Sequence, residues 1–323
     1  MKAILVALFA VCALSFAHSN SYYKAQFGAY TAKFNKNYSA QETRYRLSVF
    51  SENLDFINAE NEKGHSYTLG ITPFVDMTHD EFKASRICGC MMKKPAHSLR
   101  NSRTLKEDIP ASINWIEKGA VNAVKNQASC GSCWAFSAVA AMEGVDAIKN
   151  GKLQSFSEQQ LVDCDHKSNG CNGGLMDNAF EYVINHRGIC SEEAYPYTAK
   201  DGSCKDSTCT SIAKFSDFVD VEENNGKQLL AAIAKNPVSV AVEADSFVFQ
   251  YYTGGVVTDD ACGTSLNHGV AAVGYGTEEG KKYILVRNSW GGDWGVDGYI
   301  KIGHVDEGTG VCGINMMASY PLA

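Results

Sequence analysis

After its first 17 residues, the sequence contains no apolar run that could cross a bilayer, which takes about 20 residues. It also lacks clusters of lysine and arginine, so no nucleic acid or acidic membrane surface is expected as a partner. No internal repeat is visible. The one Cys-x-x-Cys pair, Cys130 and Cys133, has no second pair to complete a zinc site, so neither a metal nor another cofactor is predicted.

The start of the chain differs from the rest. Lys2 precedes an apolar run over residues 3–14, and Ser-Phe-Ala at residues 15–17 places small residues at the −3 and −1 positions of a cleavage site. These features predict a secretory signal peptide over residues 1–17. A short membrane anchor is the alternative, but the run is shorter than a membrane span requires.

A signal peptide sends the chain into the secretory pathway, where disulfides persist. Of the 12 cysteines, only Cys12 would leave with the signal. The expected destination is the lysosome, a digestive vacuole or the outside of the cell. The sequon Asn37-Tyr38-Ser39 makes Asn37 a candidate for glycosylation there.

The rest of the chain consists of two unlike parts. It has 323 residues, 45% of them hydrophobic, which suffices for more than one packed domain. Residues 18–107 have a formal net charge of +4, whereas residues 108–323 have −12. The polar, basic stretch from Lys93 to Lys106 lies between them and contains a proline, so an exposed linker is expected.

Apolar residues in the first part recur at helical spacing. One series is Tyr23, Phe27, Tyr30 and Phe34, and the other is Leu47, Phe50, Leu54 and Ile57. Steps of three and four residues place each series on one face of an amphipathic helix. We therefore expect two helices that pack by these faces.

A six-residue pattern overlies the second of these helices: Glu42, Arg46, Phe50, Asn53, Ile57 and Asn61. It resembles the propeptide signature of the cathepsin L-like branch of the papain family of cysteine proteases. Downstream, Gly70-x-Thr72-x-Phe74-x-Asp76 resembles the second propeptide motif of that branch, with Thr72 where the family usually has asparagine. The resemblance implies that residues 18–107 are an α-helical inhibitory propeptide. Cys88 and Cys90 are unusual there.

The second part begins with a helical run, Trp134–Lys149, after a turn rich in glycine, serine and cysteine. Strand-like segments separated by glycine-rich turns follow at Val238–Val242, Gly269–Tyr275, Tyr283–Arg287 and Gly298–Ile302. Helices followed by strands predict an α+β fold, or two subdomains with a cleft between them.

The strongest chemical signal is Gln127-Ala-Ser-Cys130-Gly-Ser-Cys133-Trp134. It matches the known signature around the papain-family nucleophile. A thiol attacks as its thiolate, and both a helix N-terminus and an imidazolium favour that form. Cys133 stands where the turn becomes a helix, so it is the predicted nucleophile.

The partner base is predicted to be His268. It lies 135 residues after Cys133, at the start of an apolar segment, within the family range of about 130–150 residues. His166, His186 and His304 have polar surroundings and are expected at the surface.

Asn288-Ser289-Trp290-Gly291 resembles a further family motif. It implies that Asn288 accepts a hydrogen bond from the His268 imidazole and that Trp290 shields this bond from water. The resemblance also implies an oxyanion hole formed by the Gln127 side chain and the Cys133 backbone N–H.

The papain-family resemblance covers nearly the whole chain after the signal. It implies a papain-like two-subdomain fold, with a helical and a β-barrel-like half on either side of a cleft, over residues 108–323. It also implies the disulfides Cys130–Cys171, Cys164–Cys204 and Cys262–Cys312. Cys190 and Cys209 remain, and their even number suggests that they pair with each other.

The resemblance further implies a set of substrate-binding residues. Gly173 and Gly174 would present backbone to an extended peptide, while the pocket for the residue two before the scissile bond maps to Leu175, Met176, Ala241, Leu266, Gly269 and Met317. All are apolar or lack a side chain, which favours Leu, Phe or Val at that position and disfavours Arg. Met317 narrows the floor, so branched aliphatic residues should be preferred over aromatic ones. No insertion resembles a loop that closes one end of the cleft, which predicts an endopeptidase.

Two other classes of protein compete with this interpretation. Cys130 and Cys133 could serve a thiol–disulfide oxidoreductase, but the required βαβ context is missing and Cys171 competes for Cys130. A non-enzymatic protein built on disulfides would leave the set of Gln127, His268 and Asn288 unexplained. For the peptidase, the expected partners are protein and peptide substrates, its own propeptide and cystatin-type inhibitors, and the enzyme is expected to be a monomer that is activated by acid.

Overall fold

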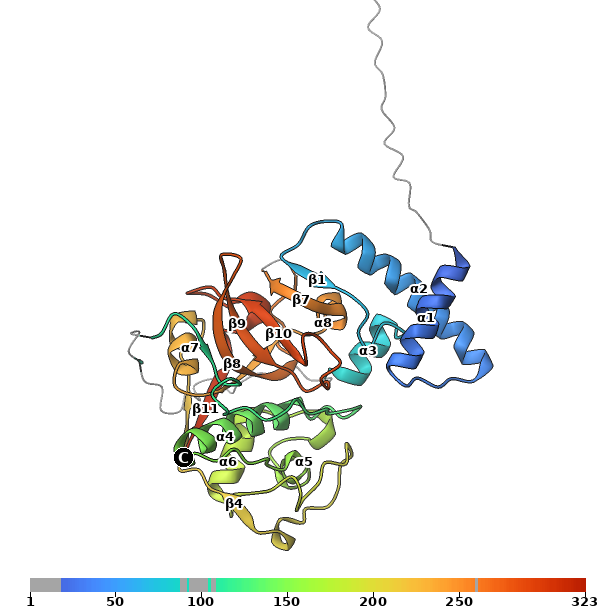
Figure 1. Cartoon of the computed structure of the whole chain (residues 1–323). Coiled ribbons are helices and arrows are strands. Elements are labelled where there is room, and N and C mark those ends of the chain that lie inside the picture. Colours follow the sequence, from blue (N-terminus) through green and yellow to red (C-terminus); the bar gives the residue numbers. More distant parts are fainter. Residues whose placement is uncertain (1–18, 88–91, 93–103, 106–108, 259–260) are drawn as a thin grey trace, which may run out of the picture.

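The computed structural model describes residues 19–87, 92, 104–105, 109–258 and 261–323. The predicted signal peptide, Cys88, Cys90 and most of the predicted linker lie outside this set. Figure 1 shows a small helical assembly formed by residues 19–87 of the first part, beside a larger body formed by the described residues of the second part, 109–258 and 261–323. The larger body has a sheet in its upper half and helices in its lower half.

Within its described residues, the first part forms three helices and one strand: α1 (Asn20–Lys33), α2 (Ala40–Asn61), β1 (Tyr67–Leu69) and α3 (His79–Arg86). The two apolar series lie on helices α1 and α2 and face each other, except that Phe34 follows the last residue of α1 as its C-cap, so the two predicted helices are confirmed. The ring of Phe50, fully buried, packs against Phe27 at 5.4 Å and Tyr30 at 5.1 Å between centroids. A capping box of Thr78 and Glu81 begins helix α3.

The amide side chains of the six-residue pattern hold the segment that follows helix α2. Asn53 donates from Nδ2 to the carbonyl oxygens of Val75 (2.8 Å) and Met77 (2.9 Å). Asn61 donates to the Leu69 carbonyl (2.8 Å) and accepts from the Leu69 N–H (2.9 Å). Because each amide satisfies backbone groups of the next segment, the pattern fixes the path of residues 69–77 along the helix.

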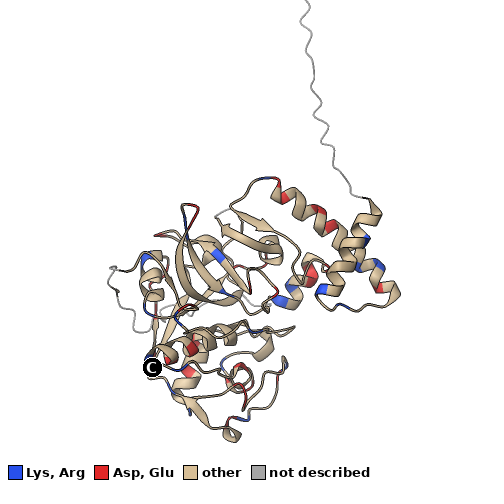
Figure 2. Cartoon of the chain, in the orientation of Figure 1, with Lys and Arg blue, Asp and Glu red and all other residues tan. Residues whose placement is uncertain are grey.

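Charged residues of the first part form ion pairs with one another. Arg46 bridges helices α2 and α3 through Glu81 (2.7 Å) and donates to the backbone oxygen of Asp76 (3.0 Å). The Asp76 carboxylate, 2% exposed, accepts from Lys36 (3.3 Å) and the Tyr38 hydroxyl. Figure 2 shows that both signs of charge are interspersed on these helices.

The helices of the second part are α4 (Cys133–Asn150), α5 (Glu158–Cys164), α6 (Met176–Asn185), α7 (Gly226–Ile233) and α8 (Phe247–Tyr251), with short 3-10 turns at Gly170–Asn172, Asp206–Thr208 and Val311–Gly313. Helix α4 includes the predicted run Trp134–Lys149 and is buried over most of its length. Helices α4, α5 and α6 pack around Trp134, Met142 and Phe180 to form the core of the lower half (Figure 1).

The strands of the second part are β2 (Ile113–Asn114), β3 (Ile189–Cys190), β4 (Ser211–Ala213), β5 (Asp217–Asp220), β6 (Val238–Val242), β7 (Tyr252–Val257), β8 (His268–Glu278), β9 (Lys281–Arg287), β10 (Tyr299–Gly303) and β11 (Ala318–Leu322). The main sheet has the order β1-β7-β10-β9-β8-β6-β11-β5, with β2 beside β8. The four predicted strand segments all lie in it, and a mixed α+β fold with two halves is confirmed.

Strand β1 of the first part extends this sheet at its edge. It pairs antiparallel with strand β7, with Tyr67 opposite Gly255 and Thr68 opposite Gly254. Gly255 has φ +75°, and a Cβ there would lie 2.3 Å from the Ser66 carbonyl oxygen, so only glycine allows the approach. The first part therefore docks by adding a strand as well as by packing helices.

The expectation that His304 lies at the surface is wrong. Its side chain is 1% exposed, and its Nε2 lies 3.1 Å from a carboxylate oxygen of Asp306. Burial lowers the pKa of the ring despite this carboxylate. Polar neighbours in sequence indicated a loop, but the ring folds back against Gly226, the first residue of helix α7.

Four disulfides join cysteines of the second part: Cys130–Cys171, Cys164–Cys204, Cys190–Cys209 and Cys262–Cys312. The first three lie in the helical half and the fourth in the sheet half. Cys133 stands outside these four bonds.

We expect the Cys190–Cys209 bridge to stabilise the second part measurably. Its ends are 19 residues apart, and closing such a loop contributes about 3 kcal/mol in the chain-entropy model. The isolated second part is alkylated without reduction under denaturing conditions and weighed. One modified thiol is expected, and three would show that this bridge does not form. Replacing both cysteines by serine should lower the free energy of unfolding by that amount.

Candidate active site

Cys133 is the first residue of helix α4 and is fully buried. The turn before it is anchored by the Cys130–Cys171 disulfide and by the Gly131 N–H, which donates to the Cys171 carbonyl at 2.8 Å. The thiol therefore sits at the positive end of an 18-residue helix, where a thiolate is favoured.

His268 begins strand β8, directly beside this helix end. The next residue, Gly269, explains the approach, because a Cβ there would lie 3.2 Å from the Trp134 Cα and 3.3 Å from the Cys133 carbonyl oxygen. A larger residue would push strand β8 away from helix α4. The structure therefore brings the predicted nucleophile and base together from the two halves of the body.

Asn288 and Trp290 fix the orientation of the imidazole. Nε2 of His268 lies 2.8 Å from Oδ1 of Asn288, and the Trp290 ring stacks on the imidazole with 4.7 Å between centroids. An amide oxygen can only accept, so Nε2 carries the proton in the neutral ring. Nδ1, which has no hydrogen-bond partner among the described residues, is then the basic nitrogen.

Burial lowers the pKa of His268 to about 4, although its hydrogen bond to Asn288 acts in the opposite direction. In this arrangement the imidazole is therefore neutral at pH 7. A neutral ring stabilises a neighbouring thiolate less than an imidazolium would.

Gln127 is fully buried beside the nucleophile turn. Its Oε1 accepts from the Ser289 hydroxyl at 2.6 Å, which points Nε2 the other way. Nε2 donates to the carbonyl oxygens of Cys130 (3.0 Å) and Arg86 (3.4 Å). Arg86 belongs to the first part. A backbone carbonyl of that part therefore accepts a hydrogen bond from the Gln127 side-chain amide, which is the predicted donor to the oxyanion.

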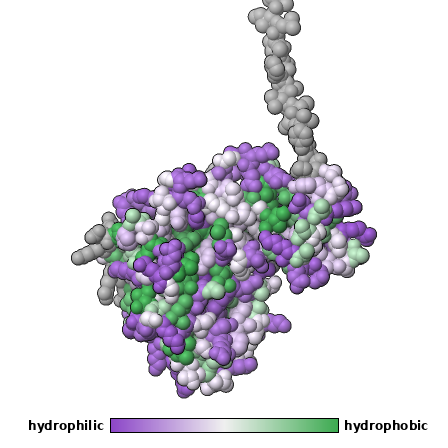
Figure 3. Space-filling model, in the orientation of Figure 1, coloured by the Kyte–Doolittle hydropathy of each residue, from purple (hydrophilic) through white to green (hydrophobic). Residues whose placement is uncertain are grey.

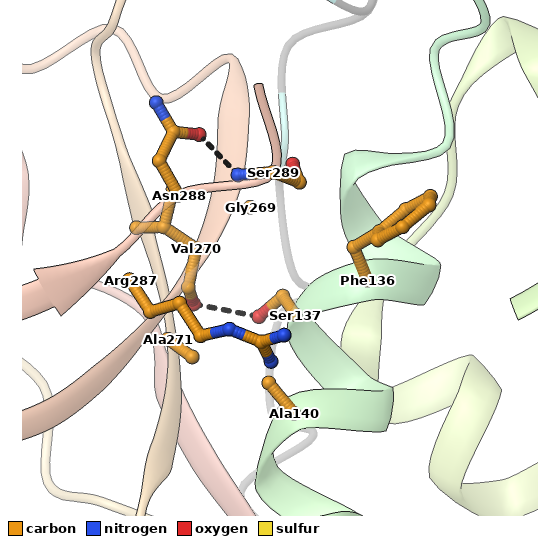
Figure 4. Close-up of a pocket in the computed structure, with 9 residues that line it drawn as sticks. All are labelled: Phe136, Ser137, Ala140, Gly269, Val270, Ala271, Arg287, Asn288 and Ser289. Atoms are coloured by element: carbon orange, nitrogen blue, oxygen red, sulfur yellow. Dashed lines mark hydrogen bonds between the residues drawn. The ribbon is translucent and has the colours of Figure 1, made fainter. Parts of the chain in front are cut away.

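The seam between the two halves runs directly behind these residues. A small cavity of about 10 Å³ lies in this seam. Figure 4 shows Phe136, Ser137 and Ala140 of helix α4 on one side of it, and strand β8 with the last residue of strand β9, Arg287, on the other. The Ser137 hydroxyl donates to the Val270 carbonyl at 2.7 Å across the seam. The Arg287 guanidinium reaches toward helix α4, where Glu143 lies 3.8 Å away. The halves are thus linked by polar contacts close to Asn288.

The residues mapped to the substrate pocket share one buried cluster. Met176, Ala241, Leu266 and Met317 belong to its core, and Leu175 packs against it. Gly173 adopts φ +108°, and a Cβ on Gly174 would lie 2.6 Å from the Trp134 ring, so both glycines allow the chain to pass close to the nucleophile.

Met92 of the first part fills this cluster. It is 3% exposed, belongs to the same buried core, and donates its N–H to the Leu266 carbonyl at 2.8 Å. Its side chain thus belongs to the same buried cluster as the residues mapped to the pocket, and its backbone pairs with one of them. The sequence did not identify Met92, because a methionine beside a linker carries no distinctive pattern.

Gln250 is a second residue that the sequence did not reveal. It is fully buried on helix α8 and donates from Nε2 to the carbonyl oxygens of Phe74 (3.2 Å) and Met77 (3.1 Å). The backbone carbonyl oxygen of Gln250 accepts a hydrogen bond from the Thr72 hydroxyl at 2.7 Å. Thr72 therefore supplies a direct bond to the second part from the position where the family usually has asparagine.

Aromatic rings complete the contact between the two parts. Phe74 and Phe82 meet the Trp290 ring edge-on at 5.8 Å and 5.4 Å, which covers the residue that shields His268. Phe56 packs on Phe247 at 4.7 Å. Figure 3 shows apolar residues at the surface where the N-terminal helices meet the larger body. The first part therefore blocks the site through apolar packing and hydrogen bonds.

Comparison with protein families decides what this arrangement is. A model described as papain family cysteine protease matches residues 109–322. The chain belongs to this family. A model of the cathepsin propeptide inhibitor domain matches residues 27–82. The chain is thus a papain-family cysteine endopeptidase that carries its propeptide, in agreement with the predicted family.

The relatives of this papain-family enzyme include several plant proteases. It is 49% identical over 298 residues to KDEL-tailed cysteine endopeptidase CEP2 of Arabidopsis thaliana, covering 88% of this chain and 81% of that one. It is 46% identical over 308 residues to cysteine protease XCP2 of the same plant, covering 91% and 85%. It is also 47% identical to the longer probable cysteine protease RD21B, of which it spans 63%.

Solved precursors have the same fold. The recombinant stem bromelain precursor superposes with a TM-score of 0.86 at 39% identity and covers 93% of this chain and 98% of its own. Digestive procathepsin L2 from Tenebrio molitor larval midgut gives 0.85 at 39% identity, with coverage of 93% and 100%. The papain-like fold with an attached propeptide is therefore established.

Two further observations bear on the alternatives. Cys130 is bonded to Cys171, so a redox pair of Cys130 and Cys133 is not supported. Among the described residues, no helix has both the length and the apolar character needed to cross a membrane.

Proposed function

We propose that the enzyme hydrolyses peptide bonds with Cys133 as nucleophile and His268 as base, after acid releases the propeptide. The main support is the convergence of Cys133, His268 and Gln127 beneath a propeptide that covers all three. Asn288 orients the imidazole through the 2.8 Å contact with Nε2.

In the proposed reaction, Nδ1 of His268 takes the thiol proton of Cys133, and the sulfur attacks the carbonyl carbon of the scissile bond. The carbonyl oxygen becomes an oxyanion that accepts from the Gln127 Nε2 and the Cys133 N–H. His268 gives its proton to the departing amine, and a thioester remains. Water then adds with His268 as base, the carboxylic acid leaves, and the thiol is regenerated.

Labelling tests this function. The activated enzyme is treated with an irreversible thiol-directed epoxide and weighed before and after digestion into peptides. We expect one label, on Cys133, together with loss of turnover. A label on Cys130, or on no cysteine, would contradict the proposed nucleophile.

The apolar pocket predicts substrate preference. Met92 shares the buried cluster of Ala241, Leu266 and Met317, which supports binding of an apolar residue, Leu, Phe or Val, two residues before the scissile bond. In a peptide library, Arg there should be cleaved about 100-fold less well than Leu, because its charge would be buried without a partner. Equal cleavage of Arg and Leu would contradict the mapping.

A matched variant sharpens this test. Met317→Glu places a carboxylate within the same cluster. Cleavage of peptides with Arg two residues before the scissile bond should therefore rise, while cleavage of peptides with Leu at that position should fall. A preference for branched aliphatic over aromatic residues at the same substrate position is a separate expectation. It depends only on the width of the pocket beside the Met317 side chain.

The remaining proposals concern the setting of the enzyme. The predicted signal peptide and four disulfides support passage through the secretory pathway to a lysosome, a vacuole or the exterior. Asn37 is exposed, which supports it as a glycosylation site. We further propose a monomer, which the propeptide and cystatin-type proteins inhibit at the same cleft.

A further inference from the structure

The hydroxyl of Tyr197 lies between the two sides of the predicted oxyanion hole. It is 2.8 Å from the Gln127 backbone oxygen and 2.6 Å from the Ser132 Oγ. Ser132 immediately precedes Cys133 in the chain. We propose that Tyr197 is a positioning residue that fixes the distance between the two oxyanion donors, an inference that rests on the proposed roles of Gln127 and Cys133.

The direction of each hydrogen bond follows from the groups present. The Gln127 carbonyl can only accept, so the Tyr197 hydroxyl gives it its single proton. Ser132 must then donate to the tyrosine oxygen. This agrees with Ser132 standing at the start of helix α4 without a side-chain cap bond. The three groups form one hydrogen-bonded chain from Ser132 through Tyr197 to Gln127. Without the Tyr197 hydroxyl, this chain no longer connects Ser132 to Gln127.

Gln127 depends on this contact because its neighbourhood is otherwise strained. The next residue, Ala128, has φ +53°, a region that alanine rarely adopts. On the side of the sheet half, the Ser289 carbonyl oxygen accepts a hydrogen bond from the Gln127 N–H at 2.8 Å. Tyr197 holds the carbonyl of the same residue from the helical half. Without its hydroxyl, one side of the Gln127 peptide loses its anchor, and the side-chain amide can turn with it.

Tyr197 is itself held firmly. Its ring meets Phe136 edge-on at 4.8 Å between centroids, and its N–H donates to the Glu192 carboxylate at 2.9 Å. The segment that carries it is closed by the Cys190–Cys209 bridge and tied to helix α5 through Cys204. The additional cysteine pair, Cys190 and Cys209, therefore helps to hold the segment that carries Tyr197.

The hydroxyl also keeps its proton over the working range of pH. Burial raises the pKa of Tyr197 to about 12, although the bond from Ser132 acts in the opposite direction. The bond to Gln127 therefore persists in acid and at neutrality.

Tyr197→Phe tests the proposal, with Tyr195→Phe as the matched control. Tyr195 belongs to the same segment, and Tyr195→Phe removes the hydrogen bonds of its hydroxyl to Asp163 at 2.7 Å, to the Ser203 carbonyl at 3.5 Å and from the Lys205 N–H at 3.1 Å, none of which involves Gln127. In the activated full enzyme, we expect Tyr197→Phe to lower kcat about tenfold with little change in KM, as misplacement of a transition-state donor does. Tyr195→Phe should stay within twofold of wild type.

Two further measurements separate positioning from general loosening. Iodoacetamide alkylates Cys133 without forming an oxyanion, so its rate and pH profile should be unchanged in Tyr197→Phe. In a Gln127→Ala background, adding Tyr197→Phe should cost less than twofold, because the donor that it positions is gone. Full additivity, or slowed alkylation, would overturn the proposal.

The outcomes also distinguish this proposal from the proposed function. If Gln127→Ala alone lowers kcat but Tyr197→Phe does not, the positioning role fails and the oxyanion role stands. If Gln127→Ala leaves kcat unchanged, the oxyanion role fails, and the role of Tyr197 fails with it. An equal loss in Tyr195→Phe and Tyr197→Phe would show only a weakened segment, which also contradicts the proposal.

Discussion

Replacing Cys133 with alanine is expected to reduce peptide turnover by about 10⁶-fold, the scale on which removing a catalytic nucleophile acts. No other residue in the site can form the thioester. The variant cannot activate itself, so its linker is cut by tagged wild-type enzyme, which is then removed. Turnover of a fluorogenic peptide measures the loss.

The fold must survive for this result to be informative. Cys133→Ala should keep the thermal unfolding temperature of the wild type within a few degrees and should still bind added propeptide. Gln127→Ala should cost about 10²–10³ in rate, as expected for one oxyanion donor. Turnover by Cys133→Ala at more than trace level would contradict the proposed mechanism.

The sequence predicted the residues of the site better than it predicted how they are held. Cys133, His268 and Asn288 carry local signatures, because each must follow a particular turn or begin a particular strand. The helix faces around Phe50 were also readable, since periodicity is a local property. The structure adds distances, the tautomer and the covering of the site.

Gln250, Tyr197 and Met92 were missed for a physical reason. Each acts through a hydrogen bond or a buried contact with residues far away in the chain: Gln250 with residues about 175 positions earlier, and Tyr197 with one 70 positions earlier. A side chain that is used only at such a distance leaves no spacing or composition signal. The burial of His304 was misjudged in the same way, because loop residues can fold inward.

The structure also changes the account of how charge secures the propeptide. The charge difference between the two parts predicts attraction across their interface. Among the residues that the structure describes, however, the ion pairs of the propeptide are internal, including Arg46–Glu81 and Lys36–Asp76. The contacts across the interface are aromatic and apolar packing and hydrogen bonds to neutral groups, including one from the Arg86 guanidinium to the Ala128 carbonyl oxygen at 3.0 Å. Acid should therefore act on the propeptide's own fold more than on pairs between the parts.

His268 contributes little to this acid response. Its pKa is about 4 under the propeptide and should rise when the site opens. The proton that it then gains comes from the Cys133 thiol as the ion pair forms. The pair therefore binds the same number of protons in both states, and stability does not change with pH through this route.

Glu81 is the better candidate. Burial alone would raise its pKa, but the hydrogen bond and charge of Arg46 outweigh burial and lower it. Its contribution to the propeptide fold is then complete above the ordinary carboxyl pKa of about 4.3 and is lost as the pH falls through the lowered value. Stability should therefore be steady from pH 7 to about 5 and decline below that.

We therefore expect separately made propeptide to inhibit the mature enzyme less well at pH 4 than at pH 7, by up to about threefold through Glu81 alone. Glu81→Gln should weaken inhibition at pH 7 and flatten the response to acid, because the Arg46 bond loses its charge. Glu52→Gln, which removes the same charge from an exposed site on helix α2, should behave like wild type.

Added salt at pH 7 should weaken binding as far as long-range attraction contributes. Inhibition that is equal at pH 7 and pH 4 would leave the apolar contacts of Phe74, Phe82 and Met92 as the main latch. Equal effects of the two glutamate variants would instead point to net charge.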